Sequence, residues 1–263
     1  MILVIDIGNT NLKMGVFDGD VLVDSIRLAS SARKTADEYY MSIKSLFEIK
    51  NIDLKSITGV IISSVNPNLN YTIEHMIDYY FGFPPIIVGS GIKSGLNVRY
   101  DSAKEVGADR IVNSVSAYKT YGGPCIVIDC GTATSFNVIS KNGEFLGGAI
   151  SFGLKSSAEA LGNSAAKLPN VEFVKPSTVI NKSTITNMQA GIIYGYCGMV
   201  DYIVRKIKKE LGGDDVKVVA TGGLSEIVAN ESDVIDVVDR TLTLRGLNVL
   251  YQLNSEKNQG DKS

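Results

Sequence analysis

Short runs of apolar residues alternate along the chain with longer segments of helical spacing. Apolar positions three and four residues apart predict helices over 69–81, 103–121 and 186–211. The second of these would end at the Gly-Gly-Pro sequence that follows it. Continuous apolar runs predict strands at 57–65, 86–88 and 216–220. Strands that alternate with helices in this way are typical of an α/β fold.

The most informative pattern is an internal repeat of a strand that ends in Asp-x-Gly. Residues 3–9 read Leu-Val-Ile-Asp-Ile-Gly-Asn, and residues 126–132 read Ile-Val-Ile-Asp-Cys-Gly-Thr. Each copy continues into a second apolar strand with an Asp-Gly or Asn-Gly turn, which predicts a β-hairpin. The two aspartates are 123 positions apart in a chain of 263 residues. This spacing indicates two similar lobes that face each other rather than a solenoid.

The turn after the first strand carries residue types that suit a phosphate site. Gly8 has no Cβ, so backbone N–H groups there can approach phosphate oxygens closely. Asn9 and Thr10 add side-chain donors, Lys13 adds a positive charge, and Asp6 can hold Mg²⁺. A plain hairpin turn would explain one such copy, but a second copy favours nucleotide binding.

The second copy, over residues 129–134, again places an acid at the end of its strand. Asp129 could cap the turn through local hydrogen bonds. Two carboxylates at one polyphosphate need cations between them, however, and this favours a functional role. A third turn, Thr-Gly-Gly-Leu at 221–224, follows a predicted strand and would let a nucleoside lie against the backbone. Such turns are common in α/β loops, so this signal is weak by itself.

A Gly-Ala-Asp-Arg motif at 107–110 lies near the start of the predicted helix over 103–121. Asp109 is a candidate general base, and Arg110 is a candidate bidentate partner for a substrate carboxylate. An adjacent Asp-Arg pair near a helix start is usually a solvated face, so this motif needs further support. Neither Tyr100 nor the only histidine, His75, is evidence for a functional site by itself.

Two common nucleotide-binding motifs are excluded. The glycines at 89–95 resemble the dinucleotide fingerprint, but the third comes one residue late, and the following segment reads as loop and strand. The sequence Gly-x₄-Gly-Lys-Ser/Thr does not occur, which excludes a P-loop.

Composition narrows the chemistry further. The chain has 26 basic and 28 acidic residues, a balance that argues against a nucleic-acid partner. One histidine excludes a two-histidine metal site, and three cysteines without a Cys-x-x-Cys pair indicate reduced thiols. The sequence contains neither a long apolar span nor an export signal. We therefore expect a cytoplasmic protein with no membrane partner.

In combination and in this order, the motifs resemble the type III pantothenate kinase family, which belongs to the actin, sugar-kinase and Hsp70 ATPase superfamily. The resemblance extends from residue 2 to about residue 250, and it includes Gly-Gly-Ala-Ile at 147–150 and Ser-Thr at 183–184 before a helix. It implies duplicated ribonuclease H-like (actin-like ATPase) lobes around a central nucleotide cleft. The expected division is an N-terminal lobe over 1–117, a C-terminal lobe over 118–251 and a polar, disordered tail over 252–263.

The resemblance also implies an activity, namely ATP-dependent phosphorylation of pantothenate to 4′-phosphopantothenate, the first step of coenzyme A synthesis. The enzyme would be a homodimer with its substrate pocket near the dimer interface. ATP phosphates and Mg²⁺ would be bound by Asp6, Ile7, Gly8, Asn9, Thr10, Asn11, Leu12, Lys13 and Thr132. Asp129 would bind a monovalent cation, K⁺ or NH₄⁺. Pantothenate would be held by Tyr100, Gly107, Ala108, Asp109, Arg110 and Thr184, with Asp109 as the proton acceptor.

Two positions depart from the family pattern, because Phe152 stands where proline is usual and Asn181 stands where glycine is common. Both lie in loops expected to frame the substrate. One alternative is therefore a kinase of the same fold that acts on another hydroxyl-bearing acid or on a sugar. The other is a regulatory protein that binds nucleotide without transferring phosphate, although the acids and the lysine of the motifs argue against it. Phosphoryl transfer itself depends on positioning and charge neutralisation, so it requires neither histidine nor cysteine.

Overall fold

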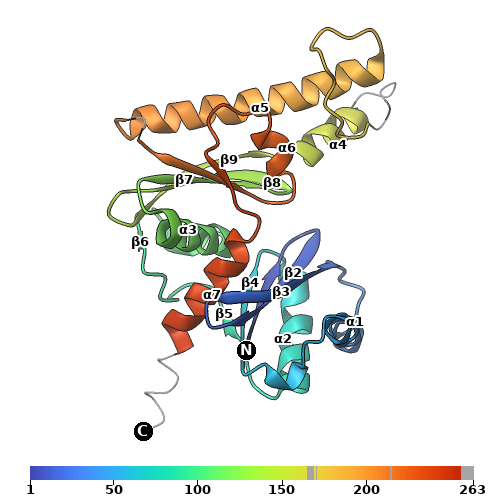
Figure 1. Ribbon diagram of the computed structural model, residues 1–263, viewed down its shortest axis with the longest axis vertical. Coiled ribbons are helices and arrows are strands. Elements are labelled where there is room, and N and C mark those ends of the chain that lie inside the picture. The colour runs from blue at the N-terminus through green and yellow to red at the C-terminus, as the bar shows by residue number, and fades with distance from the viewer. Residues whose placement is uncertain (165–168, 170, 214, 256–263) are drawn as a thin grey trace. The chain divides into compact units, whose positions relative to one another are not determined.

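The chain forms two compact units, each built around a mixed β-sheet (Figure 1). The computed structural model describes residues 1–164, 169, 171–213 and 215–255. The first unit comprises Met1–Leu96, Tyr100–Ser116 and the chain from Thr241 onward. The second unit comprises Asn97–Arg99 and Ala117–Arg240.

The sheet of the first unit has the strand order β3-β2-β1-β4-β5. Its strands are β1 (Ile2–Ile7), β2 (Asn11–Asp18), β3 (Val21–Ala29), β4 (Gly59–Ser64) and β5 (Ile86–Ile87). The central strand β1 is antiparallel to β2 and parallel to β4. Because both faces of this strand are covered, its sequence is a continuous apolar run that ends at the polar turn.

Helices cover both faces of this sheet. On one face, α1 (Ala36–Ile49) and α2 (Pro67–Phe81) pack against alternate residues of β1, including Leu3 and Ile5. The opposite face, which contains Val4, packs against α3 (Ala108–Tyr121) and α7 (Leu242–Ser255). Two short 3₁₀ turns, Leu54–Ser56 and Ala103–Glu105, complete the unit.

The sheet of the second unit repeats the same order and directions. It reads β11-β10-β7-β8-β9, with β6 added at the edge beside β9. The strands are β6 (Asn97–Val98), β7 (Cys125–Cys130), β8 (Ala133–Ile139), β9 (Glu144–Phe152), β10 (Lys217–Thr221) and β11 (Val237–Val238). Here β7 is antiparallel to β8 and parallel to β10, just as β1 is to β2 and β4. This repetition confirms the predicted duplicated ribonuclease H-like fold.

One face of the second sheet is covered by α4 (Leu154–Ser164), α5 (Thr184–Glu210) and α6 (Ser225–Ala229). Figure 1 shows α5, drawn in orange, as the longest helix of the chain. The buried residues of α5 recur every three or four positions: Met188, Ile192, Tyr196, Val200 and Val204. This spacing presents one apolar stripe to the sheet.

Three expectations about element boundaries need correction. The helix predicted over 103–121 is broken at Val106 and Gly107, and α3 begins at Ala108. Residues 97–99 and 117, expected in the N-terminal lobe, lie in the second unit, and residues 241–251, expected in the C-terminal lobe, lie in the first unit. For 241–251 the reason is that Leu247 of α7 packs with Val4 and other first-unit residues. Residues 252–255 extend α7 rather than the tail, and 256–263 lie outside the described residues.

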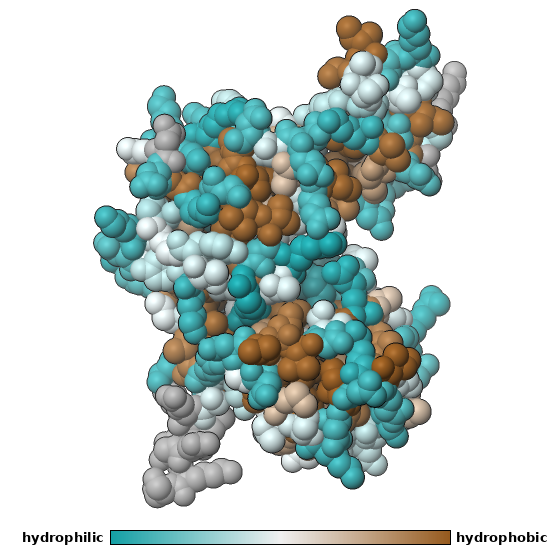
Figure 2. Space-filling model, viewed as in Figure 1, coloured by the Kyte–Doolittle hydropathy of each residue, from teal (hydrophilic) through white to brown (hydrophobic). Residues whose placement is uncertain are grey.

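The surface of each unit is mixed in character. Figure 2 shows brown apolar areas between teal polar side chains. Among the most exposed apolar residues is Ile180, at 90%. All three cysteines are free and buried. In the described part of the chain, helices fall short of the length and apolarity needed to cross a bilayer.

Candidate functional site

The first of the two repeated turns joins β1 to β2 and is closed by its own backbone. The Gly8 N–H donates to the Asn11 carbonyl at 3.0 Å, and the Ser30 hydroxyl donates to the Gly8 carbonyl at 2.7 Å. A Cβ at position 8 would lie 3.0 Å from the Asn11 oxygen, so a larger residue would strain the turn. The Gly8 N–H is thus already hydrogen-bonded within the turn. The contribution of glycine to a phosphate site would be the absence of a side chain, which leaves room for the phosphate near the backbone.

A charged pair lies at the base of this turn. Asp6 and Lys13 are register partners across β1 and β2, with 3.7 Å between Asp6 Oδ2 and Lys13 Nζ. Asp6 is only 7% exposed, and the lysine compensates a charge that burial would otherwise make costly. Asn9 and Thr10 are exposed at the tip, where their polar groups can reach a ligand.

Some residues in 6–13 contribute only backbone to any ligand site. Ile7 and Leu12 are 0% exposed, and they belong to the core formed with α1 and α2. Successive side chains of a strand point to opposite faces of the sheet, so part of a strand motif always faces the core. Nucleotide binding by these two residues therefore remains a prediction about their N–H and carbonyl groups.

The second turn, between β7 and β8, is held by the junction of β9 with α4. Its Gly131 N–H donates to the Ala133 carbonyl at 3.1 Å. The carbonyl of the exposed residue Thr132 accepts from the Gly153 N–H at 3.1 Å and from the Ser156 hydroxyl at 2.7 Å. A Cβ at Gly153 would lie 2.3 Å from the Gly131 oxygen, so this close approach requires glycine.

The glycine-rich turn after β10 packs against the end of β7. Thr221 and Asp129 are register partners, and Gly222 follows with a φ of +95°. A Cβ at Gly222 would lie 2.6 Å from the Cys130 carbonyl oxygen and 2.8 Å from Asp129 Oδ1. The structure thus brings the second and third predicted turns together, with a carboxylate and a carbonyl oxygen at their junction.

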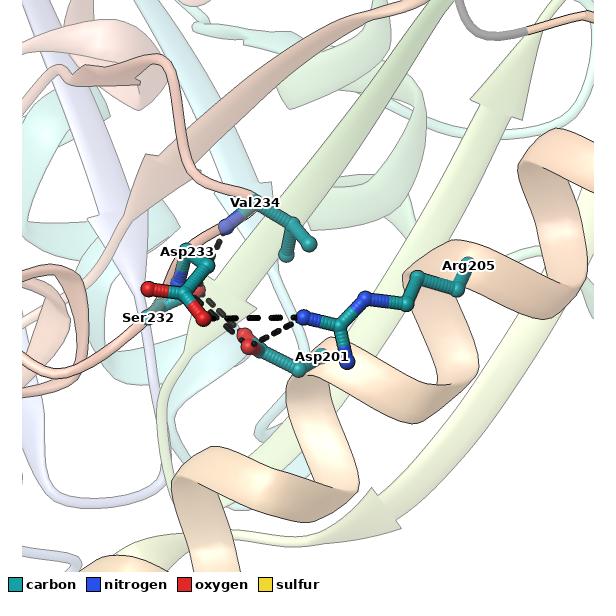
Figure 3. A network of polar contacts seen from close by, with 5 residues as sticks. All are labelled: Asp201, Arg205, Ser232, Asp233 and Val234. Carbon is teal, nitrogen blue, oxygen red and sulfur yellow. Dashed lines mark hydrogen bonds and ion pairs between the residues drawn. The ribbon is translucent and has the colours of Figure 1, made fainter.

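A polar network anchors α5 to the chain that follows this third turn (Figure 3). Asp201 accepts hydrogen bonds from the Ser232 hydroxyl at 2.6 Å and from the Asp233 N–H at 3.3 Å. The Arg205 guanidinium lies 3.2 Å from the Asp201 carboxylate and 3.7 Å from that of Asp233. Because Asp201 is 8% exposed, these partners are needed to compensate its burial. The network ties the middle of α5 to the segment between α6 and β11.

The Gly-Ala-Asp-Arg motif surrounds the start of α3. The half-buried Asp109 carboxylate accepts a hydrogen bond from the Arg110 N–H at 2.8 Å. Burial raises the pKa of Asp109, while the positive charges of Arg110 and Lys13 act in the opposite direction. Arg110 is 6% exposed, and its guanidinium carbon lies 5.8 Å from the centre of the Tyr100 ring. The motif is therefore a partly buried charged site rather than a solvated helix face.

Thr184 lies in the other unit from these residues. It is the exposed first residue of α5, whereas Tyr100 and residues 107–110 belong to the first unit. The helix begins two residues before the predicted start at 186 and includes Thr184, because the Ser183 side chain accepts a hydrogen bond from the third residue of the helix at 3.2 Å. A joint role of Thr184 and Asp109 in binding one substrate stays a prediction.

Of the two departures from the family pattern, Phe152 lies on a strand beside the second turn rather than in a loop, and Asn181 lies in the loop before Thr184. Phe152 ends β9 with 67% of its surface exposed. Asn181 donates a hydrogen bond to the Thr178 carbonyl at 2.7 Å, which shapes the loop before α5. His75 is exposed on α2, with its ring centre 5.9 Å from that of Tyr71. These contacts give the histidine a packing role on its helix.

Sequence reasoning missed several residues that support the turns. Ser30 and Ser156 bond to turn carbonyls from distant segments, and no local pattern marks a serine for that task. Tyr196 was read only as part of a helix, yet its hydroxyl lies 2.5 Å from the Thr134 hydroxyl. Gly153 follows Phe152 in the same glycine-containing segment, and a glycine at that position is the available sequence signal of a close backbone approach.

The model of a known family, type III pantothenate kinase, matches residues 2–206. The chain belongs to this family. The match covers the repeated turns, the Gly-Ala-Asp-Arg motif and most of α5, so it confirms the predicted resemblance. For a type III pantothenate kinase, the implied activity is that of an enzyme that uses ATP to phosphorylate pantothenate in coenzyme A biosynthesis.

Solved structures support the same fold for this type III pantothenate kinase. One is a Campylobacter jejuni protein proposed to be a Baf family transcriptional activator, with a TM-score of 0.59 and 20% identity over 97% of this chain and 99% of that chain. Another is the inorganic polyphosphate/ATP-glucomannokinase from Arthrobacter sp. strain KM, with a TM-score of 0.53 and 14% identity over 97% and 98%. A third is a protein of Sinorhizobium meliloti proposed to be a 2-dehydro-3-deoxygalactonokinase, with a TM-score of 0.54 and 12% identity over 96% of each chain.

Proposed function

We propose that this enzyme transfers the γ-phosphate of ATP to the primary hydroxyl of pantothenate, with Asp109 as general base. The observation that carries the proposal is the environment of Asp109, a half-buried carboxylate beside a buried arginine at the start of α3. Asp109 lies in the same unit as the first phosphate turn. It would accept the hydroxyl proton as the oxygen attacks phosphorus in line, and its carboxylic acid would form.

The remaining residues of this unit position the substrates. Arg110 supplies a guanidinium suited to the pantothenate carboxylate, and its approach to the Tyr100 ring limits its orientations. Lys13 supplies positive charge for the transferred phosphoryl group, and residues 6–13 together with Thr132 are the proposed phosphate ligands. Gly107, Ala108 and Thr184 are proposed to line the pantothenate site.

The oxygen donors in the turns suit hard cations. Among the described residues, no group of three or more His, Cys, Asp or Glu side chains is arranged to hold a metal ion. The single carboxylate of Asp6 fits Mg²⁺, which commonly takes one or two carboxylates plus substrate phosphates. Asp129 Oδ1 and the Cys130 carbonyl oxygen, both against Gly222, fit K⁺ or NH₄⁺. When bound, the cations would offset the charge of the phosphates.

We further propose that two copies of the chain pair through the region around the start of α5. The side chains there are exposed and apolar, with Val179 at 66%, Ile180 at 90% and Ile185 at 50%. A second copy would bury them beside Thr184. Light scattering should give twice the mass of the chain, and Ile180→Asp should give the mass of one chain. A monomeric wild-type protein at assay concentration would contradict this part of the proposal.

A coupled assay with ATP, Mg²⁺, K⁺ and pantothenate tests the function directly. We expect turnover with pantothenate and weaker turnover with other hydroxyl-bearing acids and with sugars. Preference for a sugar would favour the alternative hypothesis, a kinase of the same fold with another acceptor. That hypothesis stays open because the exposed Phe152 stands where the family usually has proline. Tight ATP binding without turnover of any acceptor would favour the regulatory alternative. The cytoplasmic location remains a prediction, which localisation of a tagged full-length chain would check.

A further inference from the structure

We propose that Tyr196 of α5 is a positioning residue for the second turn, residues 129–134, and thereby for ATP and the monovalent cation. The inference rests on the proposed function, in which Thr132 binds phosphate and Asp129 binds the cation. Tyr196 itself touches neither ligand in this account. It acts through Thr134, the last residue of the turn.

The contacts of Tyr196 are short and buried. Its hydroxyl lies 2.5 Å from the Thr134 hydroxyl. The Thr134 hydroxyl in turn donates to the Phe152 carbonyl at 3.2 Å. Thr134 is 0% exposed and Tyr196 6%, so water cannot readily replace these partners.

The available hydrogens set one direction for this chain of bonds. Thr134 has a single hydroxyl hydrogen, which it gives to the Phe152 carbonyl. Thr134 must then accept from the Tyr196 hydroxyl. The tyrosine hydroxyl thus donates to Thr134, and Thr134 donates to the last carbonyl of β9.

The turn is consequently fixed from two sides. The junction of β9 and α4 holds the Thr132 carbonyl through Gly153 and Ser156. Tyr196 holds the other side from α5, a helix that Asp201 anchors to a separate segment of the same unit (Figure 3). Loss of the tyrosine hydroxyl would free one side of the turn while leaving the aromatic ring to pack. We therefore expect the change to weaken binding of ATP and the cation more than it lowers the free energy of unfolding.

The test compares Tyr196→Phe with Tyr118→Phe, which removes a tyrosine hydroxyl that donates to the Lys141 carbonyl at 3.3 Å in the same unit. Steady-state kinetics would give KM for ATP, the half-saturating K⁺ concentration and KM for pantothenate. We expect the first two to rise about three- to tenfold in Tyr196→Phe, the usual effect of one lost hydrogen bond. KM for pantothenate and all parameters of Tyr118→Phe should stay near wild type.

A second pair of variants covers the case in which Tyr196→Phe folds poorly. Thr134→Val should raise KM for ATP and the half-saturating K⁺ concentration, whereas Thr134→Ser, which keeps the hydroxyl, should restore them. The inference is overturned if Tyr196→Phe or Thr134→Val folds with wild-type values for ATP and K⁺, or if Thr134→Ser behaves as Thr134→Val does.

Calorimetric titration of the wild-type protein and these variants with ADP and Mg²⁺, with and without K⁺, separates this inference from the proposed function. If the wild-type protein phosphorylates no pantothenate, the proposed function fails. The weaker ADP binding expected of Tyr196→Phe would still support the positioning role, and unchanged ADP binding would overturn it.

Discussion

The two repeated turns both join antiparallel strands, but the loop of the first is one residue longer and their aspartates have different register partners. In the first unit, the register partner of Asp6 is Lys13, which lies 3.7 Å from it. In the second unit, the register partner of Asp129 is the neutral residue Ser135, and the neighbouring turn instead brings the Cys130 carbonyl and Gly222 together beside the carboxylate. The first turn contains a lysine beside its aspartate, and the second brings a carboxylate and a carbonyl oxygen together.

This difference indicates how duplication can yield two distinct sites. The lysine beside Asp6 offsets part of its charge, and the oxygen atoms beside Gly222 are of the kind that hard cations prefer. The proposed assignment of Mg²⁺ to Asp6 and of K⁺ or NH₄⁺ to Asp129 comes from the family resemblance and agrees with that contrast.

The largest expected effect lies outside both turns and tests whether the chemistry depends on Asp109. Asp109→Asn should lower kcat/KM by about 10²- to 10⁴-fold, the usual contribution of a general base. In the wild-type protein, kcat/KM should fall as the pH is lowered through the raised pKa of Asp109, and this acidic limb should be absent from the variant. A pH series of coupled assays measures both effects.

The same variant should not unfold more easily. Because burial raises the folded-state pKa of Asp109, this group favours folding below its unfolded-state pKa, and that contribution is lost as the pH rises through the folded-state pKa. At neutral pH the ionised carboxylate thus carries a cost that asparagine lacks. Thermal unfolding checks this point, and a large loss of stability or near-normal turnover would contradict the assigned role.

The next largest effect concerns the first turn. Lys13→Met should reduce kcat by roughly 10²-fold, because it removes a charge for the transferred phosphoryl group and leaves Asp6 without its cation. It should also lower the unfolding temperature, since Asp6 is 7% exposed. Lys13→Arg keeps the charge and serves as the control. Equal losses in both variants would show that shape rather than charge matters at this position.

A smaller effect follows from moving the lysine into the second turn. Ser135→Lys should place a positive charge beside Asp129 and reduce the need for K⁺, so that activity without K⁺ rises about tenfold, equivalent to about 1.4 kcal/mol. Titration of activity with KCl at constant ionic strength measures this response. Ser135→Met adds similar bulk without charge and should keep the requirement. If Ser135→Lys still needs K⁺ as the wild-type protein does, the comparison between the two turns is wrong.

The smallest effect concerns stability at the third turn. Gly222→Ala should lower the free energy of unfolding by roughly 1–3 kcal/mol, because the residue has a φ of +95° and its Cβ would lie 2.6 Å from the Cys130 oxygen. Gly223→Ala is the matched control, since no atom lies within 4 Å of a Cβ there. Urea unfolding of both variants provides the measurement. Equal stability of the two would mean that the turn relaxes without cost.

Much of this architecture could be read from local patterns. The repeated apolar strand with Asp-x-Gly predicted two equivalent hairpins, and β1–β2 and β7–β8 confirm them. The helical spacing after Ser183 predicted α5 almost to its ends. These predictions are correct because strand and helix periodicities, turn glycines and helix caps depend on residues that are close together in the sequence.

The same sequence did not reveal which distant segments meet. The expected helix over 103–121 is interrupted by the extended backbone of Val106, which separates the 3₁₀ turn Ala103–Glu105 from α3. The packing of α7 with the strands of the first unit is a long-range contact, and so is the hydrogen bond between Tyr196 and Thr134. The residue order thus determined the elements, the family and the candidate chemistry of this enzyme. Packing alone decided which backbone and side-chain groups support each turn, because burial and hydrogen-bond partners depend on residues far apart in the chain.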